Sequence, residues 1–232
     1  MMFAALIVAS GIALTSGAGG VINHTSYWIW AGITAADAPA NSELFVLQGE
    51  FRTERGKTSF TRAGLYPYPI TCKRLSLVYR LQKELPDPGT VVDAFRTLVV
   101  KWGRHGVVVA GLQIDFDSPT AKLAAYGHFI EKVRTQLSRD FELSIAGLGD
   151  WATNGDTPVM QGIASNADEI IFQLYQGRSL IDNVDSYIRG LQRYPEPFRI
   201  GLLSGSDVPN GVEGLKVNPH FLGIVYFIQR SP

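Results

Sequence analysis

Two aspartates, Asp115 and Asp117, lie one residue apart in the stretch GLQIDFDSPT at residues 111–120, within an otherwise apolar run. Carboxyl groups placed in this way can act as general acids and bases. An ionised carboxylate in a dry protein interior costs several kcal/mol unless it is paired. We therefore expect these two groups at an open edge of the fold, or beside a cationic partner.

Alternation along this stretch assigns its side chains to two faces, as in any β-strand. Gln113, Asp115 and Asp117 share the polar face, and the apolar face that a layer of helices would cover carries Leu112, Ile114 and Phe116. Ser118 and Pro119 are typical of the N-cap and first position of a helix, so the strand is expected to end there. Both aspartates are thereby predicted at the carboxyl end of a strand.

The same alternation places further polar and aromatic residues near the ends of other predicted strands. The polar candidates are Gln48, Glu50, Arg80, Asp150 and Gln173, and the aromatic ones are Trp28, Trp30, Trp151, Tyr175 and Tyr226. Sugars offer hydroxyl groups at their edges and C–H faces for stacking, so this combination is typical of a carbohydrate pocket. A β-bulge would move any of these side chains to the opposite face.

Each candidate also has a purely structural interpretation. Asp117 is equally compatible with capping a helix or with pairing to Arg80, and Arg80 with being a counter-ion for the aspartates. Glu50, at the root of a predicted hairpin, suits a solvated position, Trp151 a packed indole next to a turn, and Tyr175 a core position.

Eight short apolar runs separated by turn signals predict eight strands. They begin at Ser26, Glu43, Arg74, Ala110, Glu142, Glu169, Phe198 and Phe221. Helical periods of three and four residues fall between the later strands, over residues 92–102, 123–137, 157–165 and 181–191. Alternating strands and helices imply parallel pairing, and eight such strands close a barrel. The predicted fold class is α/β, a (β/α)8 TIM-type barrel, and active sites of this fold gather at the carboxyl ends of its strands.

The barrel must be compact, because such folds typically need about 250 residues and fewer remain after the N-terminal segment. Helices are expected to be missing or shortened after strands 1, 2 and 7. The chain around Arg55 and Gly56 alternates like a hairpin that extends the second strand. An open doubly wound sheet is the alternative fold, although no glycine-rich phosphate loop follows a strand.

Residues 1–22 contain an apolar run followed by small residues, which suits a secretory leader or a membrane tether, although the usual basic start is missing. We expect export, with the protein secreted or periplasmic and membrane contact only through an uncleaved leader. Residues 23–232 are predicted to form a single domain, which we expect to be monomeric.

Composition excludes several other classes of function. The 21 basic and 21 acidic residues balance, so the chain lacks the electrostatic footprint of a nucleic-acid-binding protein. A lone cysteine, Cys72, rules out an intrachain disulfide framework. The four histidines lack ligand spacing, and we expect neither a metal nor another cofactor.

Three segments together resemble a known bacterial family. They are GLQIDFDSPTAKLAAYGHFIEKVRTQL, LSIAGLGDW and DEIIFQLYQGR. They are similar to the family called domain of unknown function 3142, which is grouped with glycosidase-like TIM barrels, and the resemblance extends from about Tyr27 onward. It implies the fold more strongly than an activity.

A more distant similarity connects the chain to chitinase-like glycosidases, whose fourth strand ends in Asp-x-Asp-x-Glu. The matching positions here are Gln113, Asp115 and Asp117. This resemblance implies that Asp117 is the proton donor and that Asp115 orients an acetamido group and tunes the pKa of the donor. It implies that Tyr175 also contacts the acetamido group, and that Tyr226 or Phe227 forms the floor of a sugar subsite. The glutamine and the shorter donor depart from that pattern.

Two hypotheses follow. The first is a glycoside hydrolase acting on a polysaccharide or cell-wall glycan, with Asp117 as general acid and, for sugars without an acetamido group, Glu50 or Asp150 as second carboxylate. The second is a catalytically silent barrel that binds glycan or protein through the same opening.

Overall fold

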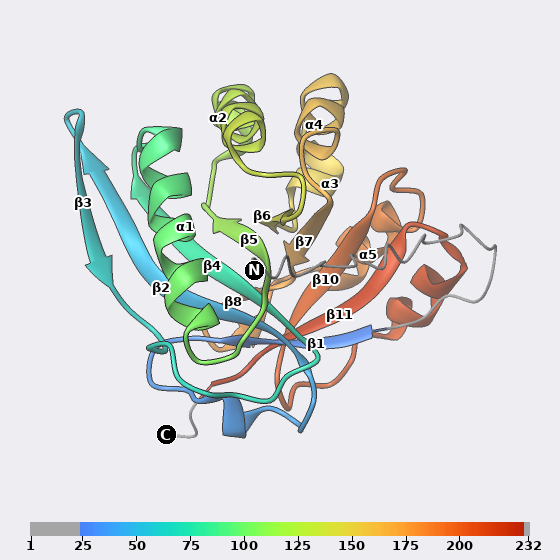
Figure 1. The fold of residues 1–232 in the computed structure, drawn as a ribbon. Helices are drawn as coiled ribbons and strands as arrows, with labels where there is room; N and C mark the ends of the chain where they lie inside the picture. The colour runs from blue at the N-terminus through green and yellow to red at the C-terminus, as the bar shows by residue number, and fades with distance from the viewer. Residues whose placement is uncertain (1–23, 230–232) are drawn as a thin grey trace, which may run out of the picture.

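The computed structural model describes residues 24–229, which fold into a closed barrel of parallel strands (Figure 1). In chain order the barrel strands are β1 (His24–Ile29), β2 (Glu43–Glu54), β4 (Arg74–Lys83), β5 (Val109–Asp115), β6 (Glu142–Leu148), β7 (Glu169–Gln173), β10 (Phe198–Leu203) and β11 (Phe221–Phe227). The sheet closes because β1 pairs in parallel with both β2 and β11. The predicted TIM-type barrel and its eight strands are confirmed.

Helices cover the outside of the barrel between the later strands. They are α1 (Pro88–Gly103), α2 (Leu123–Gln136), α3 (Trp151–Asn154), α4 (Thr157–Ala164) and α5 (Val184–Leu191). Local capping explains two of their starts, since the side chains of Asp87 and Asp156 accept hydrogen bonds from backbone N–H groups in the first turns of α1 and α4.

The connections after the first, second and seventh barrel strands lack a full α-helix, as predicted. The first and last contain only the 3-10 helices η1 (Ala35–Asp37) and η3 (Asn210–Val217). The second begins with a hairpin in which β3 (Lys57–Arg62) pairs antiparallel with β2. Arg55 and Gly56 form its turn with positive φ angles of 52° and 72°. The hairpin projects from the barrel wall (Figure 1).

Two apolar cores lie on opposite sides of the barrel sheet. The larger one fills the space between the strands and the helices and includes Leu112, Ile114 and Trp102. The smaller one fills the barrel interior and consists of Trp28, Phe45, Val78, Ala146, Ile171 and Val225. The predicted alternation along GLQIDFDSPT is correct, because Gln113 contacts the inner core through Trp28 while its two apolar neighbours face the helices.

Two local predictions were wrong. Ser118 does not cap α2, because Pro119 has an extended backbone (φ −59°, ψ 144°) and a short 3-10 helix, η2 (Thr120–Lys122), precedes the α-helix. Gln48 does not reach the barrel opening, because it shares the outward face of β2 with Leu44 and Val46, and the β2–β4 register shift between Leu47 and Gly49 turns only the following residues. Gln48 instead accepts a hydrogen bond from Trp102 Nε1 of α1, outside the barrel.

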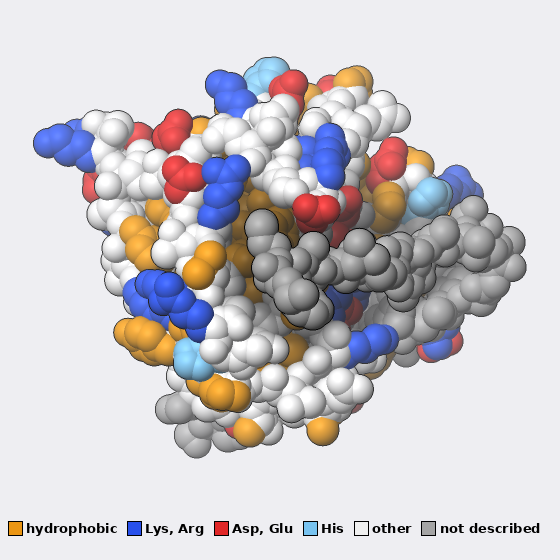
Figure 2. Space-filling view, in the orientation of Figure 1, with side chains coloured by type: hydrophobic (Ala, Val, Ile, Leu, Met, Phe, Trp, Pro, Cys, Tyr) orange, Lys and Arg blue, Asp and Glu red, His pale blue; other side chains and the backbone are white. Residues whose placement is uncertain are grey.

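The predicted leader, residues 1–22, lies outside the described residues. Within residues 24–229, no helix is long and apolar enough to cross a membrane. On the face shown in Figure 2, basic and acidic side chains are interspersed over the surface.

Candidate active site

A cleft of about 830 Å³ opens at the carboxyl ends of the barrel strands. Its charged and amide side chains are Arg80, Asp115, Asp117, Asp150, Gln173, Gln176, Asp182 and Asn183. Its aromatic side chains are Trp28, Trp30, Tyr175, Tyr187 and Phe227. Sugar pockets combine polar and aromatic groups in this way, and the cleft lies at the end of the barrel where this fold places active sites.

Asp115, the last residue of β5, lies at the base of this cleft and is only 4% exposed. Its Oδ1 accepts a hydrogen bond of 3.3 Å from Gln173 Nε2, and its Oδ2 lies 3.9 Å from Arg80 Nε. Burial raises the pKa of Asp115 to about 7, helped by the neighbouring carboxylates of Asp117 and Glu50, while Arg80 and Gln173 oppose the rise. This carboxyl group can therefore hold a proton near neutral pH.

Asp117 follows the end of β5 and is much more accessible than Asp115. Its side chain is 52% exposed, and its Oδ2 lies 3.4 Å from Arg80 Nη2. The two aspartates thus occupy different environments within one cleft, one dry and one wet. Environments that differ in this way are how active sites give two carboxyl groups separate roles.

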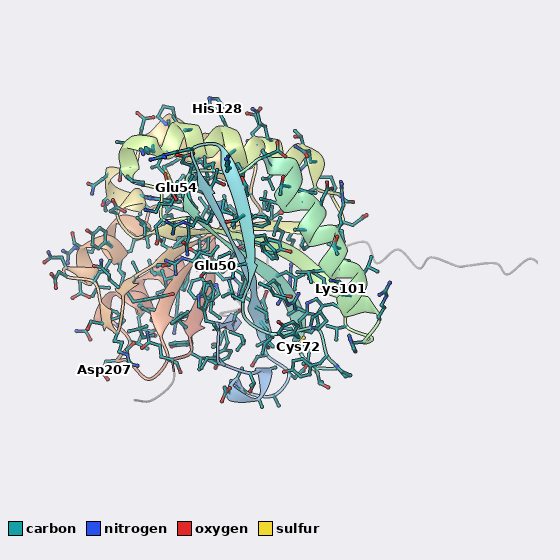
Figure 3. All side chains as sticks on the ribbon, turned by 90° about the vertical axis from the view of Figure 1, so that its left-hand side faces the viewer. Glu50, Glu54, Cys72, Lys101, His128 and Asp207 are labelled. Atoms are coloured by element: carbon teal, nitrogen blue, oxygen red, sulfur yellow. The ribbon has the colours of Figure 1, made fainter. Side chains whose placement is uncertain are left out.

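Arg80 and Glu50 lie beside Asp115 because the strand register aligns them. Glu50 pairs with Arg80 between β2 and β4, and Arg80 pairs with Asp115 between β4 and β5. Glu50 accepts a 2.7 Å hydrogen bond from Gln82 Nε2 and is not among the residues that line the cleft. Figure 3 shows Glu50 and Glu54 along β2, with Glu54 nearer to the hairpin turn.

Aromatic rings form one wall of the cleft. Tyr175 stacks on Phe227, with ring centroids 5.4 Å apart, and meets the edge of Trp28 at 6.3 Å. Burial and the two nearby aspartates hold the pKa of Tyr175 well above its usual range, so its hydroxyl group remains a neutral donor. Trp30 also packs against Phe227, in a T-shaped arrangement with ring centroids 5.6 Å apart. These rings offer flat apolar surface next to the carboxyl groups.

Gln113 lies beneath this wall and has no contact with the cleft. It is fully buried, its Oε1 accepts a 2.6 Å hydrogen bond from Trp28 Nε1, and its Nε2 donates to Ser144 Oγ at 2.9 Å. Gln113, which was predicted to bind the ligand, instead holds the indole of Trp28 in position, and that indole lines the cleft.

Trp151 and Tyr226, which were also predicted to bind the ligand, do not line the cleft. Trp151 is 1% exposed and packs in the outer core, where its Nε1 donates to the carbonyl oxygen of Ser118 and its ring meets Tyr126. Tyr226 contacts the outer core and Tyr27, whereas the next residue, Phe227, faces the cleft. Phe227 is therefore the aromatic residue of the last strand that a ligand would meet.

Four polar or aromatic cleft residues were missed by sequence reasoning, and the first of them is Gln176, next to Tyr175. Asp182 and Asn183 lie in the loop before α5, and Tyr187 lies on that helix. They reach the cleft after the small hairpin of β8 (Tyr175–Gln176) and β9 (Ser179–Leu180). Asp150, which was predicted, lines the cleft and accepts a 2.8 Å hydrogen bond from Thr120 Oγ1.

Among the described residues, no group of three or more His, Cys, Asp or Glu side chains is arranged to hold a metal ion. His128, for example, lies on α2 at the periphery with its side chain 79% exposed (Figure 3).

Comparison with known proteins identifies a family segment within the chain. Residues 72–186 match the family model DUF3142, "Domain of unknown function". The match confirms the family resemblance over close to half of the chain. No curated protein matches the sequence significantly.

One similar solved structure is the crystal structure of the Bacillus cereus spore cortex-lytic enzyme SleL. It superposes with a TM-score of 0.43 at 13% sequence identity, over 78% of this chain and 51% of that chain. The present chain thus spans about half the length of that protein.

Proposed function

We propose that this protein is a glycoside hydrolase that acts on a polysaccharide or cell-wall glycan. The supporting observation is the pairing of a dry carboxyl group, Asp115, whose pKa is raised to about 7, with the accessible Asp117 in one aromatic-walled cleft. Glycoside cleavage needs a protonated group near the working pH, and Asp115 retains a proton through burial next to Asp117, to which it can pass that proton.

Asp117 is the proposed general acid, because its half-exposed side chain can contact a glycosidic oxygen in the cleft. Asp115 is proposed to tune Asp117 and to orient the substrate. An amino sugar with an acetamido group would need no protein nucleophile, since that group can attack the anomeric carbon itself. For other sugars a second carboxylate is needed, and Asp150 is better placed than Glu50 because it lines the cleft.

A panel of labelled oligosaccharides, amino-sugar polymers included, tests the reaction and the residues together. Wild type, Asp117→Asn and Asp115→Asn are assayed beside Asp140→Asn, a control at an exposed position before β6. We expect Asp117→Asn to lose at least about 100-fold in kcat, in line with loss of general acid catalysis, and Asp140→Asn to lose nothing. Unchanged hydrolysis by Asp117→Asn would refute this donor, and loss only in Asp115→Asn would assign the donor to Asp115.

A catalytically silent binding barrel is the second candidate. The observation that favours it is Arg80, which lies within ion-pair distance of both aspartates and could lock them into a structural network. This candidate predicts that wild type binds oligosaccharides of the panel and cleaves none of them.

Action outside the cytoplasm is part of the proposal and is supported only by the leader-like sequence of residues 1–22. Expression of the full chain with N-terminal sequencing of the exported product tests it. An intact N-terminus in the cytosolic fraction would refute export.

A further inference from the structure

Carboxyl groups outnumber cationic groups in the cleft. Asp115, Asp117, Asp150 and Asp182 line it, and the only cationic side chain among its described lining residues is Arg80. The Arg80 guanidinium already lies within ion-pair distance of Asp115 and Asp117. Even with Asp115 protonated, three carboxylates would surround a ligand that meets one partly neutralised cation.

The acidic groups approach the cleft from three separate elements. Asp117 follows β5, Asp150 follows β6, and Asp182 precedes α5. Asp150 is held by Thr120, whereas Asp182 is exposed. A ligand in the cleft would therefore have carboxylates on more than one side, and Coulomb attraction inside such a partly desolvated cleft exceeds that in bulk water.

Asp115 supplies an independent observation, because one of its carboxyl oxygens is open to a ligand in the cleft. The residue is 4% exposed and lines the cleft, yet its Oδ2 has only the contact to Arg80 Nε at 3.9 Å, which is too long for a hydrogen bond. Its position favours a ligand that brings N–H or O–H donors to the base of the cleft.

The aromatic wall suits the same kind of ligand. Trp28, Trp30 and Tyr175 line the cleft beside the carboxyl groups. The faces of such rings attract cations, and tryptophan does so most strongly. Carboxylates and aromatic faces together favour an ammonium group and disfavour a carboxylate, sulfate or phosphate group on the ligand.

We infer that the cleft takes a glycan that carries free, protonated amino groups, that is, a de-N-acetylated amino-sugar chain. The inference rests on the proposed function and narrows its substrate class. It also places the positive charge of the sugar against Asp150 and Asp182, the two cleft carboxylates that have no ion pair with Arg80.

Binding of three tetrasaccharides to the whole protein tests this inference without relying on hydrolysis. The probes are a glucosamine tetramer, the same tetramer fully N-acetylated, and a galacturonic acid tetramer, titrated at 4 °C by calorimetry and by tryptophan fluorescence. We expect the glucosamine tetramer to bind at least about tenfold more tightly than the acetylated one, and the uronate not to bind. Raising the salt from 50 to 500 mM should weaken binding of the glucosamine tetramer and leave binding of the acetylated tetramer unchanged, because salt screens charge–charge attraction and the acetylated tetramer is neutral.

Two charge-neutralising variants locate the effect. Asp182→Asn should weaken binding of the glucosamine tetramer severalfold and leave binding of the acetylated tetramer unaffected, and Asp150→Asn should also weaken binding of the glucosamine tetramer severalfold. Asp140→Asn, which removes an equal charge at the other end of the barrel, should bind as wild type does. Asp182 is exposed and has no structural hydrogen bond in the cleft, so its substitution keeps the test valid even if Asp150→Asn fails to fold.

The outcomes separate this inference from the proposed function. Tighter binding of the acetylated or the uronate tetramer, or binding of the glucosamine tetramer that ignores salt and both variants, overturns the inference and leaves a carbohydrate-active cleft. Failure of all three tetrasaccharides to bind, together with no hydrolysis of the panel above, overturns both.

Discussion

The two ends of the barrel both bury charge, but they balance it differently. At the amino ends of the strands, Arg199 is enclosed by Glu43, Glu169 and Ser26, with hydrogen bonds of 2.6–2.9 Å to the three side chains. Arg74 adds a second cation beside Glu43. Burial opposes ionisation of Glu43, yet Arg199, Ser26 and Arg74 together hold its pKa below the usual value.

At the opposite end, Asp115 is buried as deeply but has no cation of the described residues within hydrogen-bond distance. Arg80 lies 3.9 Å away with its side chain 39% exposed, and two other carboxylates raise the pKa of Asp115 further. At the amino ends of the strands, here called the closed end, the paired charges stabilise the fold. At the carboxyl ends, here called the open end, Asp115 lacks a close cationic partner and can still bond to a ligand. This contrast is what distinguishes a structural ion network from a candidate site.

The largest expected effect is at the closed end. Arg199→Met leaves Glu169 buried without its cation and Glu43 with Arg74 alone, so we expect a loss of about 3–5 kcal/mol in the free energy of unfolding. Arg80→Met is the matched change at the open end. We expect Arg80→Met to lower the free energy of unfolding by about 1 kcal/mol or less, because Arg80 is partly exposed and Asp115 can take up a proton. Urea unfolding at pH 7 measures both, and equal losses would remove the contrast.

The second effect is the pH-dependent change in stability when a buried carboxyl group is neutralised, and it has opposite signs at the two ends of the barrel. Asp115 has a folded-state pKa of about 7, above the ordinary value of 3.8, so the unfolded chain releases its proton first and Asp115 lowers stability as pH rises from about 4 to 7. Asp115→Asn should therefore stabilise the protein by about 2–4 kcal/mol at pH 8 and by little at pH 4.

Glu43→Gln is the matched variant for this comparison. The pKa of Glu43 is lowered on folding, so its contribution is present above its unfolded pKa and is lost as pH falls through the folded value. The substitution should destabilise the protein at pH 8. Urea unfolding at pH 4 and 8 measures both variants, and a loss of stability for Asp115→Asn at pH 8 would contradict the account.

A smaller effect is expected from crowding the cleft wall. A Cβ atom at Gly201 would lie 2.5 Å from the Trp28 ring, so Gly201→Ala should displace that indole and weaken oligosaccharide binding. Gly147→Ala crowds Trp151 in the outer core at 2.7 Å and serves as the control. Each variant should lose about 1–3 kcal/mol of stability. Equal binding by both would show that Trp28 does not contact the ligand.

Most of the fold could be predicted because its signals are local. Strand alternation and helical periods located all eight barrel strands and the helices after the later ones, and the turn at Arg55 and Gly56 revealed the hairpin. Gln48 was misplaced because it was assigned to the same face as Glu50, whereas a register shift against β4 separates the two. Alternation with Leu44 and Val46 puts Gln48 on the outer face, and the shift itself leaves no trace in the sequence of β2.

Site residues at the ends of strands could be predicted from the sequence, whereas site residues in loops could not. Asp115, Arg80 and Gln173 follow from the parity of single strands, and the inward position of Val225 would have favoured Phe227 over Tyr226. Asp182 reaches the cleft only through the path of the loop before α5. Trp151 turns into the outer core because the chain enters α3 directly after β6.

The closed-end network was overlooked although it left a sequence signal. Glu43, Arg74 and Glu169 are each the first residue of a barrel strand, and Arg199 is the second residue of its strand. Opposite charges that recur at strand starts indicate an ion network across the amino end of a barrel. The individual pairings require the closed ring of strands, in which only β1 and β11 separate β2 from β10, so that Glu43 and Arg199 meet in the interior.

Titration of the Asp115 side-chain carboxyl group by carbon-13 NMR tests the central claim most directly. The account predicts a midpoint near pH 7 for a signal that Asp115→Asn removes. A midpoint near 4, the ordinary value for an aspartate, would show that the open end is as well matched as the closed end and would contradict the account.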